Sequence, residues 1–204
     1  MSILALCINR IASSALYAVL LYLLPVSAAA EPVVIATTEN FGVSCVDDTK
    51  CGNNAKLASD ALKGLEALER GVNWLKDAGF LVEQSKLERL GDGRRAILAV
   101  PKGHRVSCRA SAKACHTESE NQPGTSSIRI STKELSKLDA AATTLLHKFV
   151  HTMQPLRRTH WMNEAMATSV ANQWGIENGV NGTGIGTPIH TMDLDFPFYQ
   201  FPRS

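Results

Sequence analysis

The stretch Asp139–Pro155, DAAATTLLHKFVHTMQP, decides the fold of this chain. Its apolar residues recur at steps of three and four, as on one face of an α-helix. They are Ala142, Leu145, Leu146, Phe149, Val150 and Met153. Pro155 lacks a backbone N–H and ends a helix. The pattern therefore predicts a helix from about Asp139 to Gln154 with one face against a core.

Two histidines on this helix carry the clearest chemical signal. His147 and His151 are four residues apart, so their imidazoles project from one face about one turn apart and can reach one ion. At about 100° per residue they lie off the apolar stripe, between Thr144 and Gln154. We expect the helix to pack with its apolar face and to present both histidines to a cleft.

A second helix is expected from about Trp161 to Trp174. Its apolar residues share one face, namely Met166, Ala167, Val170, Ala171 and Trp174. The connection Pro155–His160 is short enough for an antiparallel helix pair. Such a return places Glu164, in the first turn, opposite His151. Glu164 is therefore the predicted third metal ligand.

Together, HKFVHTMQ (His147–Gln154) and WMNEAMA (Trp161–Ala167) resemble the gluzincin metallopeptidases. That family carries H-E-x-x-H on one helix and a ligand glutamate in an N-E-A or W-x-x-E-G-x-A context on the next. The resemblance covers Thr144–Gln173. It implies a zincin-like domain that holds one zinc ion on the two histidines and Glu164 and hydrolyses peptide bonds.

The resemblance also implies how a substrate would bind. In such enzymes an antiparallel edge strand just upstream of the first helix binds the substrate backbone. Ser126–Ser131, SSIRIS, alternates with period two and is expected to be a half-exposed strand in that place. Small residues after the ligand glutamate let the two helices approach closely, as Ala165 and Ala167 would here.

One departure affects catalysis directly. Lys148 stands where the family has the glutamate that takes a proton from zinc-bound water. An ammonium has no lone pair, and a unit charge about 5 Å from a dication costs roughly 6 kcal/mol at an effective dielectric of about 20. Lys148 could extend to solvent, deprotonate and act as a weak base, or replace the ion with its own charge. The sequence therefore indicates a secreted peptidase with weakened or lost catalysis, or a non-catalytic peptide-binding module on the same fold.

Other departures concern the surroundings of the site. Thr168 occupies the position where thermolysin-like members place an aspartate that orients a ligand histidine. Only 30 residues follow Trp174, so the C-terminal lobe is expected to be short or truncated. In the family this lobe supplies an oxyanion-stabilising Tyr or His, for which His190 and Tyr199 are the candidates. Of the histidines without a partner at ligand spacing, His104 and His116 are expected at the surface, and His160 is a possible substitute ligand.

Residues 1–30 are typical of a signal peptide. They hold a single charge, Arg10, then an apolar run that ends at Pro25, with small residues before Glu31. A membrane anchor is the alternative, but an apolar stretch of about 14 residues is short against the roughly 20 that a bilayer requires. We expect a secreted or periplasmic domain, residues 31–204, without a stable membrane span.

The net charge limits the kinds of partner, and the cysteines indicate disulfides if the compartment is oxidising. Removing Arg10 from the 21 basic residues leaves 20 against 19 acidic ones, which suggests no nucleic-acid partner. The family resemblance implies a peptide or protein partner. Four cysteines then remain as two close pairs. In an oxidising compartment they predict disulfides Cys45–Cys51 and Cys108–Cys115. Free or metal-binding thiols are the alternative, although neither spacing is C-x-x-C.

The first half of the chain indicates a sheet and one long helix. Val33–Ala36 is expected to be a strand or an extended lead-in, and Arg94–Val100 is expected to be a strand. Leu57–Leu75 is expected to be an amphipathic helix that ends near Gly79. Arg105–His116 is expected to be irregular or a hairpin. The expected fold is α+β, with a small antiparallel or mixed sheet, a packing helix and a paired active-site helix hairpin.

Overall fold

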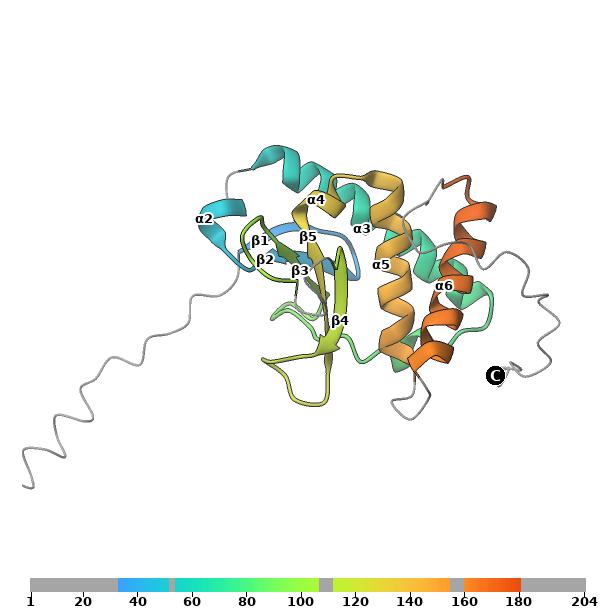
Figure 1. Cartoon of the computed structure of the whole chain (residues 1–204). Helices are drawn as coiled ribbons and strands as arrows, with labels where there is room; N and C mark the ends of the chain where they lie inside the picture. Colours follow the sequence, from blue (N-terminus) through green and yellow to red (C-terminus); the bar gives the residue numbers. More distant parts are fainter. Residues whose placement is uncertain (1–32, 52–53, 107–111, 155–159, 181–204) are drawn as a thin grey trace, which may run out of the picture. The chain divides into compact units, whose positions relative to one another are not determined.

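A computed structural model describes residues 33–51, 54–106, 112–154 and 160–180 (Figure 1). The predicted signal peptide, His190 and Tyr199 lie outside these residues. No helix among the described residues is both long and apolar enough to cross a membrane.

Five strands form one mixed sheet in the order β1-β2-β3-β5-β4. Their bounds are β1 Val34–Thr37, β2 Phe41–Cys45, β3 Arg95–Val100, β4 Ala114–Glu118 and β5 Ser126–Ser131. The central strands β2, β3 and β5 are parallel, and β1 and β4 pair antiparallel at the two ends of the sheet. The predicted combination of helices with a small mixed sheet is confirmed.

The central strands are buried along their whole length or nearly so. Every residue of β2 and β3 is buried, as expected for parallel strands inside a sheet. The sequence did not indicate β2, because Gly42 and Ser44 interrupt its apolar pattern. A Cβ atom at Gly42 would lie 2.4 Å from Leu90 Cδ1, so any larger residue there would displace the Leu90 side chain.

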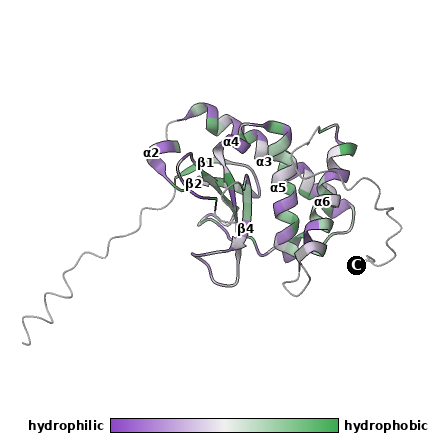
Figure 2. Ribbon diagram, viewed as in Figure 1, coloured by the Kyte–Doolittle hydropathy of each residue, from purple (hydrophilic) through white to green (hydrophobic). Residues whose placement is uncertain are grey.

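Three long helices accompany the sheet: α3 Ala55–Asp77, α5 Leu138–Met153 and α6 His160–Glu177. Short helical segments are α2 Asp48–Cys51, η1 Val82–Gln84 and α4 Thr132–Leu135. All three long helices were predicted. Figure 2 shows both hydrophilic and hydrophobic residues along α5, as expected of a helix with one buried face.

The core joins α5 to both the sheet and α3. Phe149 of α5 meets Phe41 of β2 edge to face, with ring centroids 5.7 Å apart. Leu145 and Leu146 are fully buried and pack where α3 carries Gly64 and Gly71. The helix that carries the two histidines is therefore held on its apolar face, as predicted.

The predicted helix pair is present, with α6 beside α5 and running in the opposite direction (Figure 1). On α6 the buried positions include Ala167, Ala171 and Trp174. Small side chains at two of these positions let the helix backbones approach. The segment that connects α5 to α6 lies outside the described residues.

One expectation about the sheet is wrong. Ser126–Ser131 forms β5, which lies between β3 and β4 and is mostly buried rather than half exposed. The strand at that end of the sheet is β4, which pairs antiparallel with β5. The alternating sequence of β5 could not show that this strand lies inside the sheet. That position results from its pairing with β4, whose sequence looked irregular.

The first predicted disulfide is confirmed. Cys45, at the end of β2, is bonded to Cys51, at the end of α2, with their Cα atoms 6.1 Å apart. It closes the short loop that follows β2. In the second predicted pair, Cys115 lies buried on β4, whereas Cys108 lies outside the described residues.

Candidate metal centre

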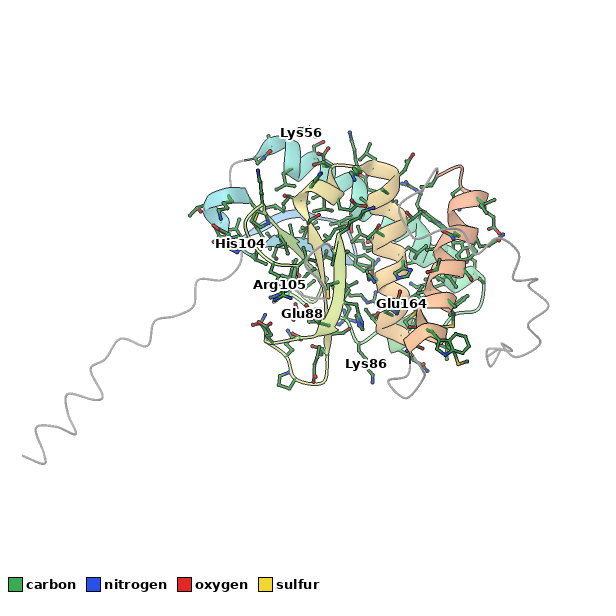
Figure 3. All side chains as sticks on the ribbon, viewed as in Figure 1. Lys56, Lys86, Glu88, His104, Arg105 and Glu164 are labelled. Atoms are coloured by element: carbon green, nitrogen blue, oxygen red, sulfur yellow. A yellow bond between two sulfur atoms is a disulfide. The ribbon has the colours of Figure 1, made fainter. Side chains whose placement is uncertain are left out.

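Three side chains from α5 and α6 converge as predicted. The Nε2 atoms of His147 and His151 lie 3.1 Å apart. One carboxylate oxygen of Glu164 lies 3.2 Å from His147 Nε2, and the other lies 3.1 Å from His151 Nε2. Figure 3 labels Glu164 where α6 lies beside α5. Among the described residues, this is the group of His, Cys, Asp and Glu side chains that could hold a metal ion.

The distances suit a single small cation. Ligand atoms about 2.1 Å from a tetrahedrally coordinated zinc ion lie roughly 3.4 Å from one another. The nitrogen–nitrogen distance of 3.1 Å is close to that value. Two imidazoles and one carboxylate from two helices are also a donor set that zinc accepts with a fourth position open. The residues present therefore fit a zinc ion.

Burial and hydrogen bonding favour, at His147 and Glu164, the protonation states that a metal requires. His147 is 3% exposed and His151 is 9% exposed. Burial lowers the pKa of His147, although the Glu164 carboxylate partly offsets this. Hydrogen bonds with His147 and His151 hold the pKa of Glu164 well below its ordinary value. Neutral imidazole and ionised carboxylate are the forms that offer lone pairs.

Gln154 sets the orientation and tautomer of His151. Its amide nitrogen donates to the backbone carbonyl of Asn163 over 2.9 Å, so its Oε1 atom must face the histidine. Oε1 lies 2.7 Å from His151 Nδ1. An amide oxygen only accepts, so Nδ1 carries a proton and Nε2, which lies beside Glu164, is the nitrogen that would bind a metal. Metal-binding histidines commonly have such a partner.

The same amide links the two helices. Gln154 follows the last residue of α5, and Asn163 precedes Glu164 in the first turns of α6. The hydrogen bond between them therefore ties the ligand on α6 to the histidines on α5. By contrast, His147 Nδ1 is buried and has no hydrogen-bond partner among the described residues. The two histidines are thus held unequally.

Lys148 lies half buried beside the site. Burial lowers the pKa of its ammonium, and the charge of Glu164 acts in the opposite direction. Within the described residues, the Glu164 carboxylate contacts His147 and His151, and no ion pair joins it to Lys148. The alternative in which the ammonium replaces the metal ion requires a direct contact with Glu164, so the observed arrangement does not favour it.

His116 was expected at the surface, and this expectation is wrong. It lies on β4, and its ring stacks on His151 with centroids 5.7 Å apart and an interplanar angle of 20°. Burial, with contributions from His151 and Lys148, lowers its pKa to about 4. Because α5 packs against β4, the end strand of the sheet borders the candidate metal centre.

Three further residues were considered for the site from the sequence. His104 has a side chain that is 38% exposed and contacts Asp47, away from the histidines of α5. Thr168 forms no hydrogen bond to a ligand histidine among the described residues, and Gln154 orients His151 instead. His160 begins α6.

The role of Gln154 was not predicted. Its sequence signal was its position three residues after His151, a spacing at which side chains on a helix come together.

Comparisons of the chain with protein-family models, with curated proteins and with solved structures found no match.

Proposed function

We propose that the chain is an exported, zincin-like protein of the gluzincin type, which holds zinc on His147, His151 and Glu164 and binds peptides beside it. The observation that carries the proposal is the convergence of these three side chains from two helices. The two Nε2 atoms lie 3.1 Å apart, each lies 3.1–3.2 Å from a different oxygen of Glu164, and one ligand atom from each residue lies within 4.8 Å of the others. Zinc lowers the pKa of water and polarises carbonyl groups, which is the chemistry that a peptidase of this kind uses.

The strand β4 supports a role in peptide binding. It is the last strand of the described sheet on the side of α5, and the stacking of His116 on His151 places it next to the metal ligands. An extended peptide that pairs with an end strand gains backbone hydrogen bonds without any requirement for sequence. This strand, rather than Ser126–Ser131, takes the place that the family resemblance implies for substrate.

Lys148 limits what the site does with a bound peptide. A protonated lysine accepts no proton, so the chain lacks the carboxylate that serves as general base in the family. We therefore propose weak hydrolysis at most. The alternative, a peptide-binding module without catalysis, is favoured by the same residue.

Peptide binding and cleavage measured on the same protein test this proposal. A library of unstructured fluorescent peptides is incubated with zinc-loaded protein, with chelator-treated protein and with Glu164→Gln. Binding by the zinc-loaded protein with slow or no cleavage is the expected result. Rapid, chelator-sensitive cleavage would refute the assignment of Lys148 as a disabling residue. Absence of both binding and cleavage would refute the peptide-binding role.

A further inference from the structure

A pocket away from the candidate metal centre lies at the carboxyl ends of the three parallel strands. Its volume is about 350 Å³, and it is lined by residues that follow β2, β3 and β5 and by the first turns of α3. In Figure 3, Lys56 from this pocket and Glu164 from the candidate metal centre are labelled in different parts of the fold. In parallel α/β sheets, ligands bind in the crevice outside the carboxyl ends of the strands.

The lining of this pocket is strongly basic. It contains four of the ten lysines of the chain, Lys50, Lys56, Lys102 and Lys133, and one acid, Asp60. Four positive charges less one negative charge leave +3, whereas the whole chain carries +2. The positive charge of the protein is therefore concentrated here.

Two of the four lysines have an acidic partner, and the other two have none among the described residues. Lys56 lies 2.6 Å from Asp60, and Lys50 lies 3.2 Å from Asp47. Among the described residues, Lys102 and Lys133 form no ion pair. Like charges around a shared cavity repel one another, and an anion between them would remove that repulsion.

The backbone adds to the attraction for an anion. Asn54 and Leu57, in the lining, mark the start of α3, a helix of 23 residues. The Asn54 side chain accepts a hydrogen bond from the Leu57 N–H, and the other N–H groups of a first turn have no acceptor inside the helix. The partial positive charge of such a helix end favours phosphate groups.

The disulfide holds one of the lysines in place. Lys50 directly precedes Cys51, whose bond to Cys45 closes the loop after β2. Lys50 Nζ also lies 3.0 Å from His104 Nε2, which in turn lies 2.9 Å from Asp47. The side of the pocket formed by this loop is therefore built by a covalent link and a network of polar contacts.

We propose that this pocket binds a small phosphate-bearing anion. Lysine ammoniums and a helix N-terminus are groups that bind phosphate, and Thr132 and Ser136 add hydroxyl groups to the lining. The pocket volume lies near the lower end of the range for small-molecule sites, roughly 300–1,000 Å³. This site is independent of the candidate metal centre.

Calorimetric titration with inorganic pyrophosphate tests the proposal. The full chain is used with its disulfide intact and after metal removal, so that pyrophosphate cannot act by binding a metal ion. The expected result is saturable binding at one site that weakens as sodium chloride is raised. The double variant Lys102→Gln/Lys133→Gln is expected to bind at least about tenfold more weakly, because both uncompensated charges are lost.

The matched control is Lys76→Gln/Lys86→Gln, which removes the same charge from exposed positions outside the pocket lining. It is expected to bind pyrophosphate within about twofold of the unchanged protein, because its charges are screened at that distance. Equal weakening in both double variants would show non-specific attraction and overturn the proposal. So would the absence of saturable binding, or retention on vesicles of phosphatidic acid without binding of free pyrophosphate. Circular dichroism confirms that each variant is folded.

Discussion

Leu146 fills the space beside Gly71 where α5 packs against α3. A Cβ atom on Gly71 would lie 3.0 Å from both Leu146 Cδ atoms, and Leu146 is fully buried. On the same helix, a Cβ atom on Gly64 would lie 3.6 Å from Leu145 and 3.7 Å from Leu135, which is ordinary contact. The tight approach at Gly71 therefore sets the position of the residue that precedes His147.

Because the space beside Gly71 is tighter than that beside Gly64, substitution by alanine is expected to have different effects at the two positions. Gly64→Ala is expected to stabilise the protein by up to about 1 kcal/mol, since alanine favours a helix interior over glycine. Gly71→Ala is expected to give no such increase in stability, because the new methyl group would displace Leu146. Since His147 follows Leu146 in the chain, this displacement is also expected to weaken metal binding. Urea unfolding and zinc titration of both variants measure this. Equal stabilisation with equal zinc affinity would contradict the packing argument.

Gln154→Leu is expected to weaken zinc binding by about 10–100-fold, because His151 loses the acceptor that fixes its Nδ1 proton. Nitrogen-15 NMR of the metal-free protein reports which ring nitrogens carry protons, and the variant is expected to carry less proton on Nδ1, because Glu164 remains as an acceptor only for Nε2. Gln154→Glu keeps an acceptor oxygen and is expected to retain the tautomer. Gln173→Leu is the control, since among the described residues the amide of Gln173 binds the exposed side chain of Glu177 and not the metal ligands. Unchanged tautomer and affinity in Gln154→Leu would count against this role.

Lys148→Glu is expected to raise peptide hydrolysis by roughly 10²–10⁴-fold, the range of general acid–base catalysis. Lys148→Met removes the charge without supplying a base, so it is expected to tighten zinc binding without raising hydrolysis. Initial rates with a mixed peptide substrate, with and without chelator, separate the two effects. A zinc-bound but inactive Lys148→Glu variant would show that another missing group limits catalysis.

Asp60 is expected to make stability depend on pH. Its carboxylate lies 2.6 Å from Lys56 Nζ, and hydrogen bonds from Lys56 and then Ser136 lower its pKa from 3.8. A lowered pKa in the folded state stabilises the protein above the ordinary value, and this contribution is lost as pH falls through the folded pKa. Asp60→Asn should therefore reduce stability at pH 7, and the difference from the unchanged protein should shrink below about pH 4.

Asp77→Asn provides the control for Asp60. Asp77 lies exposed at the other end of α3, so its loss is expected to leave the pH dependence of unfolding close to that of the unchanged protein. Thermal unfolding at pH 7 and at pH 3 makes the comparison. A stability difference for Asp60→Asn that is the same at both pH values would rule out the ionised carboxylate as its origin.

The sequence predicted those features that depend on spacing within one segment. The helices α3, α5 and α6 followed from apolar periodicity, and His147 and His151 followed from their spacing of four residues. Glu164 required only the assumption of a short antiparallel return. Each of these depends on local geometry that a helix imposes.

Features that depend on distant segments were not predictable in the same way. His116 reaches His151 only because β4 pairs with β5 and lies against α5. Gln154 binds the backbone of Asn163 only because α6 returns beside α5. The basic pocket exists because β2, β3 and β5 are parallel and end at one edge. No periodic pattern in the sequence encodes those pairings.

Zinc content, measured by mass spectrometry on protein purified without added chelator, tests whether His147, His151 and Glu164 hold a metal ion. One zinc ion per chain is expected. Glu164→Gln and His151→Ala are expected to lose the ion, whereas Glu177→Gln, at an exposed position of the same helix, is expected to keep it. Protein that contains no zinc and binds none on titration would refute this metal site, as would full retention of zinc by the Glu164→Gln and His151→Ala variants.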